Sequence, residues 1–387
     1  MLSGASTGVQ PAGRNFHGRA FTARPPRPSL VAPGRATRAR SAASAGGAPQ
    51  STAGAGGAPL SAPPNPLLVG AVEALFRFPP VFEAATKKAR AMIIQRGEAI
   101  GVDWTGTLDE LRAVPDWPAR LAAATDPAAG AYPAYYTQPF HAYKQGNLCW
   151  EAAQEFALSS ASVHAPVMDP ANKRMDADGD QQLRSSYGRC LLQLMADAPG
   201  APAPGDVRAV LDLGCATGLS SLALRELFPA AHVTGVDLSP HMVAVGRYHQ
   251  QRREAAAGAA EPLTLLHRNA EDTRLPAGSF DVVSMCLVAH ELPQHATRAI
   301  LAEAHRVLRP GGVLTIMEMD PAAPSFSRIF GNVFAFCAFK STEPWLIQYV
   351  TLDLHAAVAA AGFDAPRQAS NSPRHRTVVA VKPAAGA

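Results

Sequence analysis

Apolar residues from about position 207 onward form short continuous runs that alternate with amphipathic stretches. The runs are rich in Val, Leu and Ile and do not alternate strictly with polar residues, which predicts strands buried on both faces. The predicted strands cover residues 207–213, 232–237, 263–267, 280–287, 312–318 and 376–382. Helical spacing of apolar residues predicts helices at 219–227, 240–257, 294–308 and 353–362. This alternation predicts an α/β fold with a doubly wound, mostly parallel sheet.

The region before this pattern is helical in character. Apolar residues recur at helical spacing between Val81 and Ile93, and again from Leu183 to Leu194. Between these two stretches lies an aromatic segment at 132–143. We therefore expect an N-terminal helical cap region over residues 61–200, followed by the α/β domain over residues 201–387.

Five of the fifteen phenylalanines lie between positions 326 and 339. On one helix, Phe326, Phe330 and Phe334 would share a face. This spacing predicts an aromatic helix, either packed against the fold or covering an apolar or aromatic substrate. Close to the end of the chain, the basic triplet Arg374, His375 and Arg376 predicts a solvated loop.

The first 72 residues differ in charge from the rest of the chain. They contain seven arginines and no Asp, Glu or Lys, so removing them changes the net charge from +4 to −3 (+4 − 7). A mildly acidic body gives no reason to expect nucleic-acid binding. Residues 1–60 are rich in Ala, Gly, Pro, Ser and Arg, which is typical of an organellar transit peptide. Their composition favours the chloroplast, with the mitochondrion as the alternative.

The remaining composition narrows the class of protein further. The five cysteines form no C-x-x-C pair and have no close histidine partner in sequence, so we expect free thiols and no metal site. No apolar run reaches the roughly 20 residues that a membrane-spanning helix needs. We expect no transmembrane segment, although this composition allows peripheral membrane contact. The sequence says nothing about the oligomeric state.

The strongest motif is VLDLGCATG at 210–218, where a buried strand runs into a glycine turn and then a helix. Glycine lets the backbone approach a ligand closely, and a helix N-terminus offers free N–H groups. Asp237 ends the next strand, where a carboxylate can accept hydrogen bonds from a ribose diol. A dinucleotide site would need G-x-G-x-x-G, but Ala216 occupies the middle glycine position. An NAD(P) oxidoreductase is therefore the weaker interpretation.

Three later motifs follow in order: NAED at 269–272, FDVVS at 280–284 and RVLRPGG at 306–312. With the glycine turn, they resemble class I S-adenosylmethionine-dependent methyltransferases, especially the UbiE-like and methyltransferase-11 groups. The resemblance is strong over residues 207–319. It implies a seven-stranded Rossmann-like methyltransferase fold with S-adenosylmethionine as cofactor. The helical region and the stretch at 340–344 resemble a plastid-targeted subgroup of plants and algae.

The resemblance also implies roles for individual residues. The methionine part of the cofactor would contact Asp212, Gly214 and Gly218. The ribose would bind Asp237, and the adenine would contact Leu238, Asn269 and Ala270.

The reaction implied is methyl transfer to a small molecule, apolar or aromatic in one interpretation. His290, just after the fourth strand of the motif order, is the candidate general base, and His141 and Tyr143 are weaker ones. UbiE enzymes usually have a different pair at the position of His290, which argues against quinone C-methylation. The alternative function is a non-catalytic plastid protein that keeps the fold as a binding or assembly module.

Overall fold

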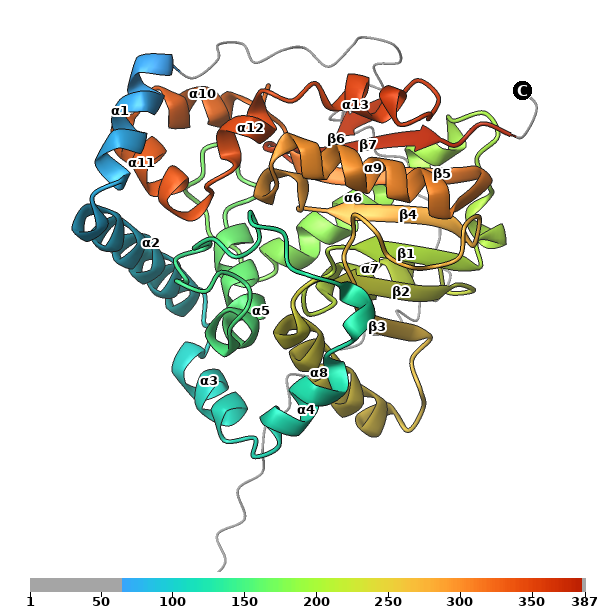
Figure 1. Ribbon diagram of the computed structural model, residues 1–387, viewed down its shortest axis with the longest axis horizontal. Coiled ribbons are helices and arrows are strands. Elements are labelled where there is room, and N and C mark those ends of the chain that lie inside the picture. Colours follow the sequence, from blue (N-terminus) through green and yellow to red (C-terminus); the bar gives the residue numbers. More distant parts are fainter. Residues whose placement is uncertain (1–64, 385–387) are drawn as a thin grey trace, which may run out of the picture. The chain divides into compact units, whose positions relative to one another are not determined.

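The computed structural model describes residues 65–384, so the predicted transit peptide at 1–60 lies outside the described residues. The fold is built on one seven-stranded sheet in the order β3-β2-β1-β4-β5-β7-β6 (Figure 1). The strands are β1 (Ala209–Leu213), β2 (His232–Asp237), β3 (Leu263–His267), β4 (Phe280–Cys286), β5 (Leu308–Met319), β6 (Arg367–Ser370) and β7 (His375–Val381). Strands β1 to β5 pair in parallel, whereas β7 runs antiparallel to both β5 and β6. The predicted fold class is confirmed.

Each face of the sheet packs on its own layer of helices. On one face, α9 (Gln294–Val307) and α13 (Leu354–Ala360) join a core with the odd-numbered β1 residues Leu211 and Leu213. The other face buries Val210 and is covered by α6 (Gly179–Ala196), α7 (Leu219–Leu227) and α8 (Pro240–Ala257). Since successive side chains of a strand point to opposite faces, both layers need apolar residues. This explains the continuous Val and Leu runs in the sequence.

The predicted element bounds hold closely in this part of the chain. The helices α7 and α8 and the strands β2 and β3 begin and end where the sequence pattern placed them. The edge strand β6 was not predicted, because its four residues are mostly polar and pair only with β7. The solvated loop expected at 374–376 is wrong, since His375 and Arg376 are buried in β7.

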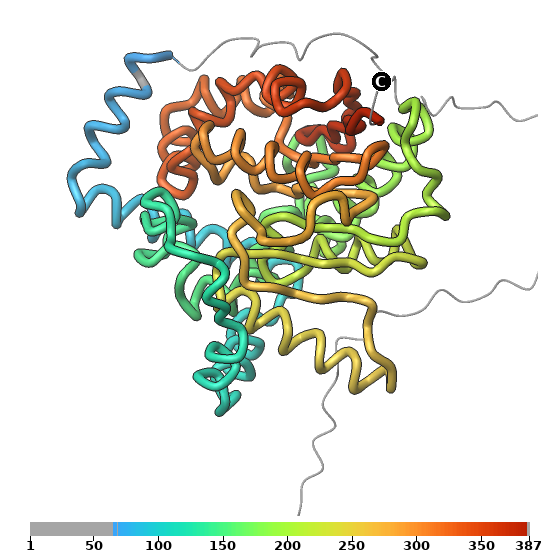
Figure 2. The backbone as a smooth tube through the Cα atoms, turned by 45° about the vertical axis from the view of Figure 1, so that its right-hand side comes forward, coloured from blue at the N-terminus to red at the C-terminus, as the bar shows by residue number. Residues whose placement is uncertain are grey.

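The N-terminal region is helical, as its apolar spacing predicts. Its helices are α1 (Pro66–Phe76), α2 (Pro79–Ala99), α3 (Trp104–Arg112), α4 (Trp117–Ala124) and α5 (Trp150–His164). The first two lie beside α11 (Val333–Thr342) in both views (Figures 1 and 2). The helix α6 belongs to the sequence region predicted as the cap, but it packs directly on the sheet. Within residues 65–384, no helix combines the length and hydrophobicity needed to cross a bilayer.

The aromatic segment after β5 does not form the single helix that we expected. It is divided into α10 (Pro324–Phe330) and α11, with α12 (Leu346–Val350) following. The break falls at Asn332, whose side chain accepts hydrogen bonds from the N–H groups of Phe334 and Ala335 and so starts a new helix. Phe326 is 2% exposed and Phe334 is 83% exposed. The prediction that they share a helical face is therefore wrong.

Candidate functional site

The bend between β1 and α7 lies where the strand order reverses, at the carboxyl ends of β1 and β4. Gly214 and Gly218 have φ values of +71° and +89°, the left-handed region that favours glycine. The N–H groups of Gly214 and Cys215 donate to the carbonyl of Val236 at 2.8 and 3.0 Å. These two bonds fix the bend against the end of β2.

Asp237 points at this bend. One oxygen of its carboxylate, Oδ2, accepts from the N–H of Ala216 at 2.9 Å, and Oδ1 accepts from the N–H of Ser239 at 2.8 Å. The nearby side chain of Tyr136 also lowers the pKa of this carboxylate. Burial raises the pKa of Asp237 above its usual value, and these hydrogen bonds oppose the rise. The bend and the acid are thus in direct contact, in the arrangement expected of a ribose site.

Asp212 is fully buried on β1 and faces the start of α7. Its Oδ2 accepts from the hydroxyls of Ser220 and Ser221 at 2.6 and 2.7 Å. Its Oδ1 has no hydrogen-bond partner among the described residues. Burial raises the pKa of Asp212 to about 6. An orphaned carboxylate oxygen beside a glycine bend fits a positively charged ligand group, such as the ammonium of an amino acid.

The residues expected to contact adenine lie at the neighbouring strand ends. Leu238 is buried directly after Asp237, and its carbonyl accepts from Nε2 of His267 at 3.0 Å. Asn269 and Ala270 follow β3, and Oδ1 of Asn269 accepts from the N–H of Glu271 within a turn. Both are partly buried. The structure thus places these three residues together at the ends of β2 and β3, and their contact with adenine stays a prediction.

His267 was not among the predicted site residues. This residue is buried at the end of β3, and its Nδ1 accepts from the N–H of Asp126 at 3.0 Å, in the segment after α4. With both ring nitrogens bonded to backbone groups, the imidazole is neutral, and burial lowers its pKa. It connects the N-terminal region to Leu238. No local motif marks this role, because both partners are backbone atoms that are distant in sequence.

His290 forms a buried ion pair with Glu318 of β5. The ring nitrogen Nδ1 of His290 lies 2.8 Å from Oε1 and 3.0 Å from Oε2 of Glu318. The backbone N–H of His290 donates to the same carboxylate. Glu318 is fully buried. The adjacent carboxylate raises the pKa of His290 to about 10, against the effect of burial. The pair with Glu318 favours the protonated ring, and the role of His290 as a general base stays a prediction.

The two weaker base candidates are also occupied. His141 lies 3.0 Å from the buried Glu343 and 3.7 Å from Glu291, and these carboxylates raise its pKa. Tyr143 donates to Glu155 at 2.7 Å, and Glu155 is also paired with Arg90 of α2. Tyr143 therefore belongs to a contact between helices of the N-terminal region.

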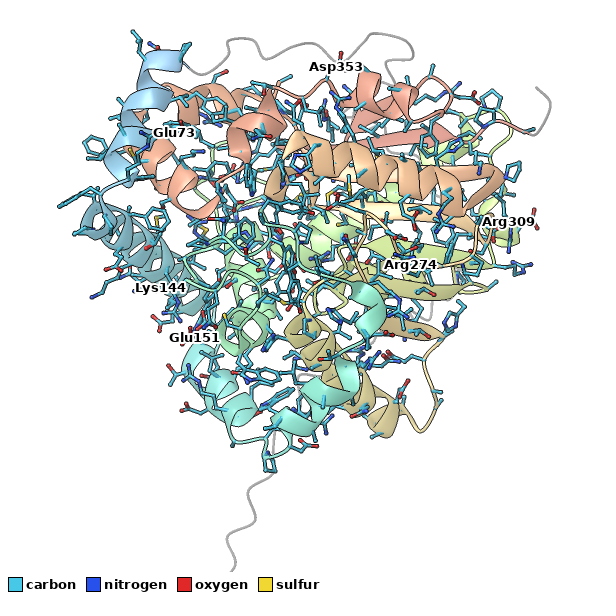
Figure 3. The ribbon with its side chains drawn as sticks, in the orientation of Figure 1. Glu73, Lys144, Glu151, Arg274, Arg309 and Asp353 are labelled. Carbon is cyan, nitrogen blue, oxygen red and sulfur yellow. The ribbon has the colours of Figure 1, made fainter. Side chains whose placement is uncertain are left out.

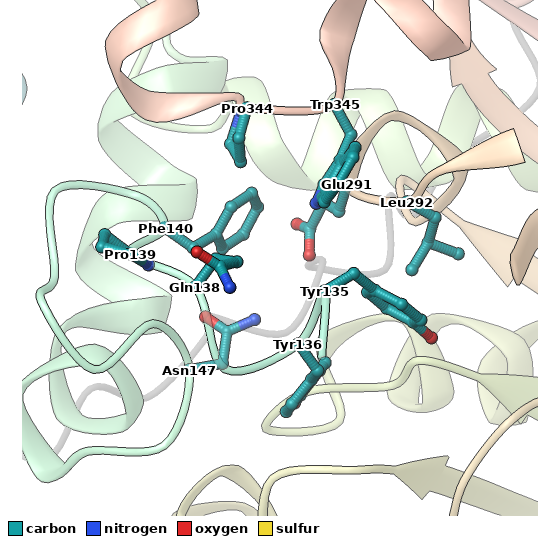
Figure 4. Close-up of a pocket in the computed structure, with 10 residues that line it drawn as sticks. All are labelled: Tyr135, Tyr136, Gln138, Pro139, Phe140, Asn147, Glu291, Leu292, Pro344 and Trp345. Atoms are coloured by element: carbon teal, nitrogen blue, oxygen red, sulfur yellow. The ribbon is translucent and has the colours of Figure 1, made fainter. Parts of the chain in front are cut away.

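Beside this cluster lies a narrow cavity that the sequence did not reveal (Figure 4). Its lining comes from the aromatic segment, from the loop after β4 and from the segment between α11 and α12: Tyr135, Tyr136, Gln138, Pro139, Phe140, Asn147, Glu291, Leu292, Pro344 and Trp345. Glu291 is the acidic residue among them. Its neighbour His290 had been the more obvious candidate in the sequence. The cavity therefore combines aromatic walls with one carboxylate.

Charge is distributed differently elsewhere on the fold. Side chains such as Lys144, Glu151, Arg274 and Asp353 lie on the periphery and are exposed (Figure 3). Ion pairs between exposed side chains contribute little to stability. Three of the buried carboxylates, Asp212, Glu318 and Glu343, belong to β1, β5 and the segment that pairs with His141. Buried titratable groups such as these mark the site.

Comparison with known proteins agrees with this placement. A family model described as "Methyltransferase domain" matches residues 210–312. A demethylmenaquinone methyltransferase of Listeria welshimeri is 34% identical over 171 residues, which cover 44% of this chain and 66% of the relative. A protein of the same name from Thermus thermophilus is 34% identical over 30% of this chain and 48% of its own length. The chain thus spans about half to two thirds of these relatives' length.

Among solved structures, an arsenic(III) S-adenosylmethionine methyltransferase from Chlamydomonas reinhardtii aligns with a TM-score of 0.36 and 21% identity, over 53% of this chain and 74% of its own. The domain is therefore assigned from the sequence match and from the strand order, bend and carboxylate described above. Together they identify residues 210–312 as part of a methyltransferase domain of the class I, S-adenosylmethionine-dependent kind.

Proposed function

We propose that this protein transfers a methyl group from S-adenosylmethionine to a small aromatic or apolar molecule inside a plastid. The observation that supports the cofactor site best is the bond between the carboxylate of Asp237 and the backbone N–H of Ala216. It brings the acid at the end of β2 onto the glycine bend. A class I methyltransferase needs both features in one place.

The residues around the bend have the chemistry that the cofactor requires. Asp237 would accept hydrogen bonds from the ribose hydroxyls, which would compete with the hydroxyl of Tyr136. The unpartnered oxygen of Asp212 would face the positive ammonium, and Gly214 and Gly218 leave room for the backbone to approach. When bound, S-adenosylmethionine supplies a methyl group activated by a sulfonium. The protein aligns the acceptor and excludes water.

The acceptor is proposed to bind in the aromatic-walled cavity. Tyr135, Phe140 and Trp345 offer flat apolar surfaces, and Gln138 and Asn147 offer amide groups that can orient a polar substituent. The curated relatives carry the name demethylmenaquinone methyltransferase, so demethylmenaquinone is the first acceptor to test, with and without a reductant. Release of S-adenosylhomocysteine measures turnover.

Calorimetric titration of the full chain with S-adenosylmethionine tests the cofactor site. In the Asp237→Ala variant we expect about 10- to 150-fold weaker binding, since hydrogen bonds to a charged group contribute about 1.5–3 kcal/mol. Asp109→Ala, at an exposed acid of α3, is the matched control and should bind like the wild type. Equal affinity of the Asp237→Ala variant and the wild type would refute the assignment. A thermal shift with NADPH and none with S-adenosylmethionine would favour an oxidoreductase instead.

The plastid location is supported by the composition of residues 1–60, which are rich in Arg and lack acids. A fusion of these residues to a fluorescent protein should enter chloroplasts in plant cells. A matched fusion with its arginines changed to glutamate should stay outside. Import into mitochondria alone would replace the plastid proposal with the alternative.

A further inference from the structure

Glu291 is placed to meet a molecule that enters the aromatic-walled cavity. It ends the short 3-10 helix Ala289–Glu291 that follows β4. Its carboxylate points into the cavity, between Phe140 on one side and Trp345 and Tyr135 on the other (Figure 4). Its side chain keeps 24% of its surface exposed. A group in the cavity can therefore reach this carboxylate.

The same carboxylate lies close to the bend that would hold the cofactor. Val288, three residues earlier, packs so closely on the bend that a Cβ added to Gly214 would lie 2.7 Å from its Cγ2. Tyr136 lines the cavity and also lies close enough to Asp237 to lower the pKa of its carboxylate. The cavity and the predicted ribose site are thus separated by one tyrosine side chain. A molecule beside Glu291 is next to the place where the reactive methyl group is expected.

The other ionisable groups around the cavity are already paired. His290 is held by Glu318 at 2.8 Å, and His141 is held by Glu343 at 3.0 Å. Glu291 lies at the longer distance of 3.7 Å from His141. The two histidine–glutamate pairs therefore flank Glu291 and leave its carboxylate facing the cavity.

On this basis, which rests on the proposed function, we propose that Glu291 is the catalytic residue that removes the proton from the methyl acceptor. The acceptor is an aromatic molecule whose nucleophilic atom bears a hydrogen. The bond between that atom and its hydrogen breaks, and the proton passes to a carboxylate oxygen of Glu291. The freed electron pair forms the new bond to the methyl carbon. The bond between the methyl carbon and sulfur breaks, and its electron pair remains on sulfur.

The surrounding charges keep Glu291 between its two protonation states near neutral pH. Burial and the negative charges of Glu343 and Asp237 favour the neutral carboxyl, and the positive charges of His141 and His290 favour the carboxylate. Together they raise the pKa of Glu291 to about 7. A general base works best when its pKa lies near the working pH. His141 and His290 therefore act as positioning residues, because they set the charge of Glu291.

The cavity is too narrow for an aromatic ring as it stands, so the segment at 135–147 must open when the acceptor enters. This opening must break the contacts of Tyr135 with Glu271 and of Tyr136 with Asp237. Binding of the acceptor is thus expected to be coupled to this movement.

The first experiment needs no acceptor. In full-length protein labelled with ¹³C at glutamate side-chain carboxyls, one NMR signal should titrate with a midpoint near 7 and be absent from the Glu291→Gln variant. Glu343→Gln removes a negative neighbour and should lower this midpoint. His141→Gln removes a positive neighbour and should raise it. A titration midpoint of Glu291 below pH 5 would overturn the proposal, irrespective of which acceptor the enzyme methylates.

The second experiment measures turnover and cofactor binding side by side. With S-adenosylmethionine and reduced demethylmenaquinone as the probe, Glu291→Gln should release S-adenosylhomocysteine about 10²- to 10⁴-fold more slowly than the wild type. The affinity for S-adenosylmethionine should be unchanged. If the Glu291→Gln variant turns over as fast as the wild type, the role of Glu291 is refuted but the proposed function is not. Failure of the wild type to bind S-adenosylmethionine would refute the proposed function. If the wild type binds the cofactor but does not methylate the probe, the carboxyl titration decides.

Discussion

The two halves of the site are built by different means. The bend half, at the ends of β1 and β2, is held by backbone N–H groups that donate to Val236 and to Asp237. The acceptor half, around the ends of β4 and β5, is held by pairs of a histidine with a buried glutamate, His290 with Glu318 and His141 with Glu343. The first half therefore depends on its glycines and on the carboxylate of Asp237. The second depends on every charge keeping its partner.

The largest effect is expected in the acceptor half. Changing Glu318 to Ala leaves the His290 cation buried without its partner, and breaking a buried pair in this way typically costs about 3–5 kcal/mol in the free energy of unfolding. Urea denaturation of the full chain measures this loss. The control, Glu151→Ala at an exposed position of α5, should change it by less than about 0.5 kcal/mol. Similar losses in the two variants would contradict the buried pair between His290 and Glu318.

The same pair predicts how stability depends on pH. His290 has its pKa raised to about 10 in the folded protein, so its stabilising contribution is complete below the unfolded value of about 6.5 and is lost as the pH rises through 10. Its share of the free energy of unfolding should fall by at most about 1.4 kcal/mol per pH unit in this window. In His290→Gln the decline should be shallower. A decline of equal slope in wild type and variant would contradict the assigned pair.

Adding a single methyl group at Gly214 should destabilise the bend half. Gly214→Ala puts a Cβ on a residue with φ of +71°, only 2.7 Å from Val288. Backbone strain of this kind costs about 1–3 kcal/mol, and we also expect weaker binding of S-adenosylmethionine. The control, Gly278→Ala, has φ of +60° but open space around its Cβ. Calorimetry should show unchanged cofactor affinity in the control, and an equal loss in both variants would mean that closeness to Val288 is irrelevant.

The smallest effect tests the link between the halves. The hydroxyl of Tyr135 donates to Oε1 of Glu271 at 2.5 Å and so attaches the aromatic segment to the turn after β3. Tyr135→Phe should lower the free energy of unfolding by about 1 kcal/mol, the usual contribution of one hydrogen bond. Tyr132→Phe is the control, because that ring is exposed. If both variants melt at the same temperature, the hydroxyl does not hold the segment in place.

The residue types along the chain are enough to predict the α/β core and the geometry of the bend half. Short apolar runs predicted the bounds of β2 and β3, and helical spacing of apolar residues predicted those of α7 and α8. Gly214, Gly218 and Asp237 lie within 24 residues of one another along the chain, and the turn geometry that joins them is local. Local geometry can be inferred from residue types, so this half of the site was predictable.

The acceptor half depends on contacts that form only when distant segments fold together. Its groups come from positions 135–147, 288–291, 318 and 343–345, and no periodicity or spacing connects segments so far apart. The sequence pointed to His290 because histidine is the usual base near neutral pH. The fold places Glu318 against that ring and leaves Glu291 facing the cavity. A side chain's charge is set by its neighbours in space, and those neighbours are fixed only when the sheet and its loops have come together.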